Sequence, residues 1–324
     1  MNRLLDFLSR ENSSGAARKL VKSVGVSVAA FSIFLMLWSA LAAQVQTSLG
    51  VLPGPAKVWE QAIVLVDEHK VERGKEAAFM ARQEVRNAEK LAKNPDAEVK
   101  IRPYTGKATF FDQILTSLLT VATGFLIASL VAIPIGIATG MSQTLYAAFN
   151  PIIQLFKPVS PLAWLPIVTM VVSAVYVSKD PLFAKSFLTS AITVTLCCLW
   201  PTIINTAVGV SSVDKDLLNV GRVLRLPWLT RTIKIVLPSS IPMMFTGLRL
   251  SLGIGWMVLI AAEMLAQNPG LGKFVWDEFQ NGSSNSLARI MVAVLVIGLL
   301  GFALDRGMLM LQRKFSWDKS AALR

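Results

Sequence analysis

Long apolar segments alternate with polar stretches along this chain of 324 residues. Each segment approaches or exceeds the roughly 20 residues that a helix needs to cross a bilayer. The pattern therefore predicts an all-α, polytopic membrane protein with six transmembrane helices. We expect these crossings at about residues 22–44, 113–141, 157–177, 186–210, 241–267 and 288–311, with prolines interrupting the third.

Basic residues gather at the ends of these segments. An even number of crossings puts both termini on one side, and basic clusters flank the first and the sixth crossing. By the positive-inside rule this side is cytoplasmic, and the basic connection between the fourth and fifth crossings falls there too. The residues concerned are Arg3, Arg10, Arg18, Lys19, Lys22, Lys215, Arg222, Arg225, Arg231, Lys234, Arg306, Arg313, Lys314, Lys319 and Arg324.

The polar stretches divide the chain into three regions. Residues 1–45 hold the cytoplasmic N-terminus and the first crossing, whose long apolar core without a clean cleavage site favours a retained anchor over a signal peptide. Residues 46–112 form an external loop, in which the charged segment 60–100 predicts a solvent-exposed helix or helical pair. This segment is either a solvated insertion or a docking surface for an external partner. Residues 113–324 form the core, with a cytoplasmic loop at 211–238.

Small residues recur every four positions in two of the crossings. This spacing lines one helical face with small side chains and lets another helix approach closely. Such a seam serves either static packing or sliding of helices during gating. The positions are Gly124, Ala128, Ala132, Gly136 and Gly140 in the second crossing and Gly247, Ser251 and Gly255 in the fifth. Local bends are also expected at Pro134 and Pro166.

The polar stretch from Asp214 to Gly253 reads as two short helices with a break at Leu226-Pro227-Trp228. Nothing in it looks catalytic. A structured knob on the cytoplasmic face of a membrane protein indicates instead a site that receives mechanical work from a soluble partner. The alternative is an ordinary basic loop whose charges only set topology.

Composition supports the membrane assignment and narrows the function. Hydrophobic residues make up 53% of the chain and charged residues 16%, with a mean hydropathy of +0.55. The net charge of +12 is accounted for by topology, so it does not indicate nucleic-acid binding. The adjacent Cys197 and Cys198 suit neither a disulfide nor a metal site and are expected to be core residues. His69, the only histidine, lies in a charged stretch and is expected to be solvated. We therefore expect no catalytic, metal or cofactor site.

Three ionisable residues lie within the apolar segments, where charge is expensive. Arg249 and Glu263 are fourteen residues apart, which is roughly 21 Å along a helix, so they do not pair directly. Arg249 is placed to meet Asp305 in a structural ion pair; alternatively it attracts an anion toward the exit of a pathway. Glu263 is expected near the outer end, where it ties loops together.

The chain contains no phosphate-binding loop of its own. None of its Gly-Lys pairs has a glycine at the spacing that the Walker A motif requires. Any nucleotide-driven work must therefore come from a separate subunit.

A family resemblance is carried by the hairpin and by the segment that follows it, IVLPSSIPMMFTGLRLSLGIGWMVLIAAEMLAQNPGLGKFVWDEFQ. Together with FKPVSPLAWLPIVTM, this segment resembles the inner-membrane permease subunits of bacterial ABC importers, in the branch that handles nitrate, bicarbonate, cyanate, taurine and alkanesulfonates. The phrases LNVGRVLRLPWLTRT and FALDRGMLMLQRKFSW are similar to the nitrate-type permeases.

The resemblance implies a type I ABC importer fold in the bacterial inner membrane and a pathway for a small oxyanion, with nitrate first and bicarbonate, cyanate or a sulfonate such as taurine as alternatives. It implies partner ATPase subunits that bind ATP and Mg, an external substrate-binding protein and a second permease chain. It also makes the hairpin the family's coupling loop, which fits a groove in the ATPase.

The family's Glu-Ala-Ala positions fall here on Asn219, Val220 and Gly221, and its glycine falls on Arg225, which departs from the pattern. A specific acidic contact is therefore not expected, and Arg225 is free to seek an acidic partner. The expected coupling residues are Asn219, Gly221, Arg222, Arg225, Leu226, Pro227, Trp228 and Pro238.

The sequence does not favour two other classes of membrane protein. An ion-coupled secondary carrier usually shows ionisable residues at mid-membrane depth and inverted repeats, and neither is evident here. A membrane-embedded enzyme needs a nucleophile, a base or a metal cluster, which one histidine and two adjacent cysteines do not supply.

Overall fold

The computed structural model describes residues 25–47, 50–94, 99, 101–177, 182–283 and 285–315. Its regular structure is helical apart from one short antiparallel hairpin, β1 (Gln46–Thr47) with β2 (Gly50–Val51). The predicted all-α class is confirmed. After an apolar helix at Gly25–Ala42, the helices are α2 (Pro55–Lys93), α3 (Phe110–Met141), α4 (Gln143–Phe156), α5 (Pro161–Val175), α6 (Lys185–Ser211), α7 (Lys215–Val223), α8 (Trp228–Arg231), the π-helical turn η1 (Thr232–Val236), α9 (Leu237–Ala266), α10 (Leu271–Asn281) and α11 (Ser286–Phe315).

Five of the described helices are long and apolar enough to cross a membrane: Gly25–Ala42, α3, α6, the continuous run Trp228–Ala266, and α11. They match five of the six expected crossings. The terminal basic residues Arg3, Arg10, Arg18, Lys19, Lys22, Lys319 and Arg324 lie outside the described residues.

The third crossing differs from the prediction. Instead of one segment starting near residue 157, α4 and α5 form a pair that begins at Gln143 and bends by 99°. The break has a local cause, because Ser160 caps α5 by accepting a hydrogen bond from the Leu162 amide, and Pro161 disfavours a helical conformation at the residue before it. This 99° bend thus falls before Pro161, and Pro166 and Pro134 lie inside the helices α5 and α3. Local bends at these two prolines stay a prediction.

The core of the bundle is α6 packed between α3 and α9, with the small-residue seams facing α6. A Cβ added at Gly136 would lie 2.5 Å from Thr206 Cβ, and one at Gly247 would lie 2.7 Å from Asn205 Cβ. Backbones approach this closely only where side chains are missing. The small-residue faces of α3 and α9 are therefore occupied by α6 of the same chain. The same packing buries Gly124, Ala128, Ala132, Ser251 and Gly255. Gly140 is half-buried against Val210, whose Cβ would lie 2.6 Å from an added Cβ.

Several polar side chains inside this core form local hydrogen bonds. Thr202 and Ser251 are joined by a hydrogen bond of 2.6 Å, and Ser251 Oγ donates to the Cys198 carbonyl. Cys197 and Cys198 are free and buried, which confirms their prediction as core residues. Hydroxyls that bond to nearby backbone carbonyls cross an apolar region at little cost.

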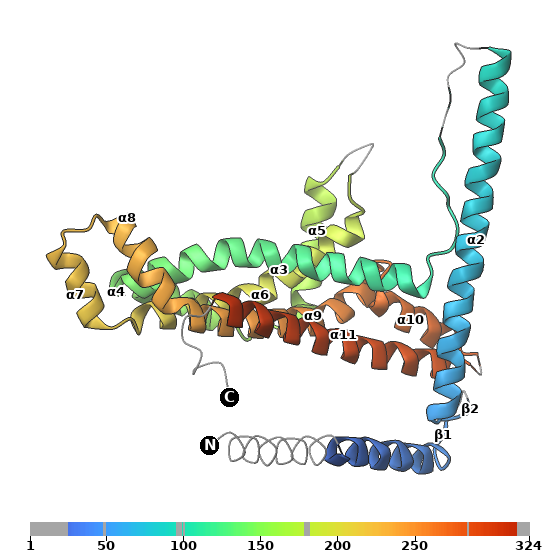
Figure 1. Ribbon diagram of the computed structural model, residues 1–324, viewed down its shortest axis with the longest axis horizontal. Coiled ribbons are helices and arrows are strands. Elements are labelled where there is room, and N and C mark those ends of the chain that lie inside the picture. The colour runs from blue at the N-terminus through green and yellow to red at the C-terminus, as the bar shows by residue number, and fades with distance from the viewer. Residues whose placement is uncertain are drawn as a thin grey trace, which may run out of the picture.

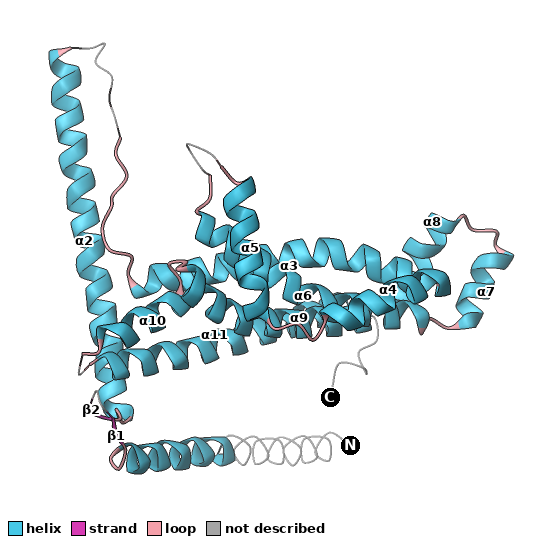
Figure 2. Ribbon diagram, turned by 180° about the vertical axis from the view of Figure 1, so that it is seen from behind, coloured by secondary structure: helices cyan, strands magenta, loops and turns pink. Residues whose placement is uncertain are grey.

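Of the two forms expected for the charged segment 60–100, a helix or a helical pair, the structure has one helix, α2, over residues 60–93. Figures 1 and 2 show α2 lying across the ends of α3 and α11, while the bundle helices run roughly perpendicular to it. Val58, Gln61 and Leu65 are buried, so one face of the first half of α2 is packed while the rest of that half is exposed. Residues 95–98 and 100 of the segment lie outside the described part of the chain.

His69 corrects a second expectation about this segment. Its Nδ1 lies 2.7 Å from Thr109 Oγ1, and its ring packs on Phe111 at 4.9 Å between centroids. Thr109 is the N-cap of α3 and forms a capping box with Asp112. The only histidine is therefore half-buried and joins α2 to the start of α3, because the chain folds back where the sequence shows only a charged stretch.

Candidate coupling site and polar groups of the bundle

The hairpin between α6 and α9 projects from the end of the bundle opposite α2 (Figure 1). Asp214 caps α7 by accepting a hydrogen bond of 2.9 Å from the Asp216 amide. The helix ends in a Schellman motif, in which the Leu226 amide bonds to the Gly221 carbonyl and the Arg225 amide to the Arg222 carbonyl. Arg225 takes the left-handed conformation with φ 48°, at the position where the resembled family has glycine. The backbone thus keeps a turn that a glycine usually provides.

Among the residues that the structure describes, several apolar side chains of this hairpin are left exposed beside its charged ones. Trp228 is 62% exposed and Val223 82% exposed, whereas Leu226 is half-buried. Val220, Val223 and Leu224 line a hollow of about 380 Å³ on α7 together with two polar residues. Sequence reasoning pointed to Trp228 but missed Val223 and Leu224, although apolar residues at i, i+3 and i+4 on a short helix were the available signal.

The base of the hairpin is firmly attached to the bundle. Gly221 is buried against Ile235, whose Cδ1 would lie 2.9 Å from an added Cβ. α8 continues through η1 into α9 without a loop, and Pro238 sits in the first turn of α9. The hairpin is therefore continuous with a spanning helix. Asn219 accepts a hydrogen bond of 3.3 Å from Arg222, whose side chain lines a second hollow beside Arg231.

Arg249 of α9 and Asp305 of α11 face each other within the spanning region. Arg249 Nη2 donates to Asp305 Oδ2 at 2.9 Å, and its Nε bonds to Oδ1. The two side chains are 39% and 37% exposed and border a cavity of about 230 Å³ with Gly253 and Gly301. The pair is bidentate, which is the geometry that fixes guanidinium and carboxylate orientation. It leaves Arg249 committed to a partner in this conformation.

Glu263 lies fully buried near the other end of α9. Its Oε2 accepts a hydrogen bond of 3.0 Å from the Gly272 amide, and the Ser117 hydroxyl lies within 2.9 Å of both carboxylate oxygens. The Gly272 amide belongs to the first turn of α10, where unpaired amides favour a negative group. A Cβ at Gly270 would lie 2.1 Å from Glu263 Oε1, so the approach depends on glycine.

The contacts of Glu263 join α3, α9 and α10. The sequence predicted a role of this kind for Glu263, namely to tie loops together near one end of the bundle. Its partners Ser117, Asn268 and Gly272 were missed. The Asn-Pro-Gly-Leu-Gly run after the carboxylate was the available signal, because it predicts a tight turn followed by a helix start.

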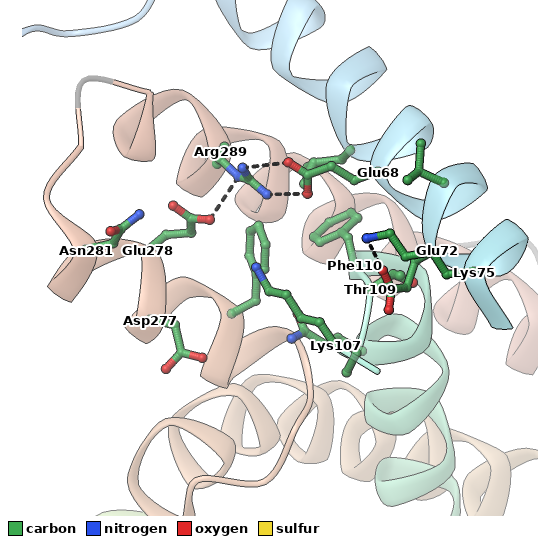
Figure 3. Close-up of a pocket in the computed structure, with 15 residues that line it drawn as sticks. Glu68, Glu72, Lys75, Lys107, Thr109, Phe110, Asp277, Glu278, Asn281 and Arg289 are labelled. Atoms are coloured by element: carbon green, nitrogen blue, oxygen red, sulfur yellow. Dashed lines mark hydrogen bonds and ion pairs between the residues drawn. The ribbon is translucent and has the colours of Figure 1, made fainter. Parts of the chain in front are cut away.

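A second charged junction, at the α2 end, also escaped sequence reasoning (Figure 3). Arg289 of α11 pairs with Glu68 of α2 at 2.7 Å and with Glu278 of α10 at 2.8 Å. The three residues border a cavity of about 480 Å³ that is also lined by Lys75 and Lys107. Its charges are largely paired with one another, so the junction fastens α2 to the bundle.

The three groups of predicted site residues therefore occupy different depths. The predicted coupling residues cluster at one end, Arg249 and Asp305 lie within the bundle, and Glu263 lies toward the α2 end. In the described part of the chain no group of three or more His, Cys, Asp and Glu residues is placed to hold a metal ion.

The sequence of the helical bundle and its hairpin matches a known protein family. Residues 132–317 match the model described as "binding-protein-dependent transport system inner membrane component". The chain belongs to this family. It is a permease subunit of an ABC importer and a multi-pass protein of the inner membrane.

Curated relatives whose names give different substrates have similar sequence identity to this chain. The nitrate import permease protein NrtB of Synechococcus elongatus is 39% identical over 194 residues, which cover 60% of this chain and 66% of that protein. The bicarbonate transport system permease protein CmpB of the same organism is 37% identical, over 63% of this chain and 68% of that protein. The taurine transport system permease protein TauC of Escherichia coli is 31% identical, over 64% and 71%.

A solved structure shares the fold. The MetNI methionine ABC transporter in its inward-facing conformation contains a chain that matches with a TM-score of 0.55 and 11% identity, covering 64% of this chain and 96% of that one. The expected type I importer fold is therefore confirmed. At this identity the likeness speaks for the fold alone.

Proposed function

We propose that this chain forms the translocation pathway of an ATP-driven importer for a small oxyanion, with nitrate as the first candidate. The observation that carries the proposal is the similarity to the nitrate permease at 39% identity. Bicarbonate remains the second candidate because its permease is nearly as similar, at 37%. Cyanate and sulfonates such as taurine are the further alternatives within the same branch.

An oxyanion passing through the bundle needs only weak and transient contacts, because a tight site slows release. Hydroxyls and backbone amides supply such contacts. Arg249 is held by Asp305 in this conformation, which supports a structural role; its second proposed role, attraction of the anion, requires the pair to open during transport. Glu263 is unsuited to hold an anion because of its like charge.

The substrate is tested with the reconstituted complex of permease, ATPase and external binding protein. ATPase activity is measured while nitrate, bicarbonate, cyanate and taurine are supplied one at a time. We expect nitrate to stimulate hydrolysis most. Stimulation by bicarbonate alone would move the chain to the second candidate, and transport without any ATPase subunit would indicate a secondary carrier instead.

The partners follow from the family and from the exposed hairpin. We infer that the hairpin docks in separate ATPase subunits, which bind ATP and Mg, and that an external substrate-binding protein delivers the anion on the opposite face. Both termini then lie in the cytoplasm, on the side of the hairpin. A second permease chain, either an identical copy or a paired relative, completes the enclosure of the pathway.

The transmission role of the hairpin rests on two features, its exposed apolar knob and its unbroken connection to α9. Leu226→Ala with Trp228→Ala removes apolar anchors and leaves every positive charge in place. We expect this double variant to insert normally but to lose the ATPase in a pull-down and to lose transport, because buried aromatic anchors dominate the affinity of small interfaces.

A matched control is Ile233→Ala, which removes an exposed apolar side chain from η1 outside the knob. It should keep the ATPase. Wild-type transport and ATPase retention in the Leu226→Ala/Trp228→Ala variant would show that the hairpin is only a basic topology loop.

A further inference from the structure

The cavity at the α2 end of the bundle has walls from several parts of the chain (Figure 3). Its volume is about 480 Å³, and it lies between α2, the start of α3, α10 and the start of α11. Much of its wall, from α2, residues 107–109 and the first turn of α3, precedes residue 132, where the match to the family model begins. The cavity is therefore largely built from residues that the family match does not include.

The chain that returns from α2 brings Lys107 to this cavity. Gly106 makes the approach possible, because an added Cβ would lie 2.1 Å from the Tyr104 ring and 2.4 Å from Glu72 Oε1. Tyr104 in turn donates a hydrogen bond of 2.7 Å to Glu72. Lys107 follows directly, and its side chain extends into the cavity (Figure 3). The backbone that bears Lys107 is therefore held against α2.

Two of the carboxylates that line the cavity have a lysine each. Glu72 pairs with Lys75 at 3.2 Å, and Asp277 pairs with Lys273 at 2.6 Å. These two pairs add no net charge to the cavity.

The other charged groups of the cavity are not matched one to one. Glu68 and Glu278 share the guanidinium of Arg289, at 2.7 and 2.8 Å, which leaves one negative charge in excess. Lys107 takes part in none of the ion pairs among the described residues, which leaves one positive charge in excess. The cavity is therefore neutral as a whole, with a negative group and a positive group that both lack a partner.

A buried polar group of the wall also lacks a partner. Gln113 lines the cavity and is only 8% exposed. Its carboxamide oxygen accepts no hydrogen bond from any residue that the structure describes. A buried acceptor without a donor is unfavourable, and such groups in folded proteins call for an explanation. An N–H donor of a ligand in the cavity supplies the missing hydrogen bond.

The remaining wall is apolar. Phe110 and Phe274 are buried, and their ring centroids lie 4.8 Å apart. Leu65 and Val71 of α2 line the same cavity. Concave sites with apolar walls and a few polar groups are typical of sites for small molecules.

The charges of the cavity select the kind of small molecule. A simple anion meets four carboxylates, those of Glu68, Glu72, Asp277 and Glu278. A simple cation meets three positive groups, those of Lys75, Lys107 and Arg289. A molecule that carries one charge of each sign matches both unpartnered groups and keeps the cavity neutral.

We propose that this cavity binds a small zwitterion with an apolar body, namely an α-amino acid with an apolar side chain. Its ammonium group faces the carboxylates around Arg289 and donates to the Gln113 oxygen, and its carboxylate pairs with Lys107. Its apolar side chain packs against Phe110 and Phe274. The ligand joins α2 to α3 and α10 at a site apart from the anion pathway, so the inference does not rest on the proposed transport function.

Binding is measured by isothermal titration calorimetry on the full chain in nanodiscs, with leucine as the probe. Isocaproate keeps the apolar body and carboxylate of leucine without the ammonium group, and isoamylamine keeps the ammonium group without the carboxylate. We expect saturable leucine binding, and about tenfold or weaker binding of each analogue, because each loses one charged contact. Leucine should also raise the Tm of the protein, since it binds the folded state.

Two variants place the ligand in the cavity. Lys107→Met removes the unpaired cation and should weaken leucine binding about tenfold or more without lowering the Tm. Gln113→Met replaces the buried carboxamide by an apolar side chain of similar size. It should weaken binding too, while the Tm of the unliganded protein stays the same or rises, because an unpartnered oxygen is removed. The matched control is Lys70→Met, which removes a lysine of α2 outside the cavity and should leave binding unchanged.

Several results overturn the proposal. They are the absence of saturable leucine binding, equal binding of isocaproate or isoamylamine, unchanged leucine affinity in Lys107→Met or Gln113→Met, and an equal loss in Lys70→Met. If Gln113→Met lowers the Tm, the decision rests on Lys107→Met, whose side chain forms none of the ion pairs of the described residues. No ATPase or transported anion takes part in this test, so its outcome is independent of the test of the substrate.

Discussion

At the scale of single residues, Arg225 shows how a backbone requirement survives the loss of its usual residue. Its φ of 48° lies in the left-handed region, which is unfavourable by roughly 1–2 kcal/mol for residues other than glycine. The Schellman hydrogen bonds from Arg225 and Leu226 hold the conformation in place. The departure from the family pattern at this position is therefore a change of side chain without a change of turn.

Arg225→Gly should stabilise the turn by about 0.5–1 kcal/mol, because glycine adopts positive φ without steric strain. Hydrogen exchange of the α7 amides in the full-length protein should slow accordingly. Arg225→Ala is the matched control, since it removes the same charge and keeps the strain. Equal effects of the two substitutions on exchange would show that the charge, and not the backbone, matters at this position.

At the scale of helices, the seams between α3, α6 and α9 depend on missing side chains. Gly136 meets Thr206 on α6, whereas Gly298 on α11 has open space around it, with nothing within 4 Å of an added Cβ. The two glycines look alike in the sequence, and only their surroundings distinguish them.

Gly136→Ala should destabilise the protein by about 1–3 kcal/mol, because the added methyl forces α3 and α6 apart. Gly298→Ala should be neutral or slightly stabilising, since alanine is the better helix former. Thermal unfolding in detergent compares the two. A neutral Gly136→Ala variant would mean that the seam is loose enough for the sliding role rather than static packing.

At the scale of the whole molecule, the charged and polar groups lie at three levels along the bundle. The exposed hairpin lies at one end, the Arg249–Asp305 pair lies within, and Glu263 and Arg289 fasten the opposite end. The bent pair α4 and α5 leaves apolar residues such as Met170 and Val175 exposed, at 65% and 80%. No other described segment of this chain covers these apolar faces. One chain therefore does not enclose a pathway on this side.

We expect the detergent-solubilised importer to contain two permease chains and two ATPase chains, because a pathway bounded by one bundle remains open on one side. Native mass measurement of the complex checks this stoichiometry. A complex with one permease chain would contradict it.

The sequence by itself determined the all-α membrane class, five of the spanning helices, the helix-break-helix hairpin and the core position of Cys197 and Cys198. These follow from local properties, namely the length of apolar runs, proline and glycine breaks, and the burial of small residues. The pairing of Arg249 with Asp305 could also be predicted from the sequence, because charges in apolar segments require partners.

Only the tertiary structure decided features that depend on which distant segments meet. His69 was expected to be solvated, but chain folding brings it to Thr109, forty residues away. Glu263 finds Ser117 across 146 positions, and Arg289 finds Glu68 across 221. The direction of α2 has the same origin, since it is set by contacts of its first half. Periodicity along the chain carries no information about such distances, because packing between elements fixes them.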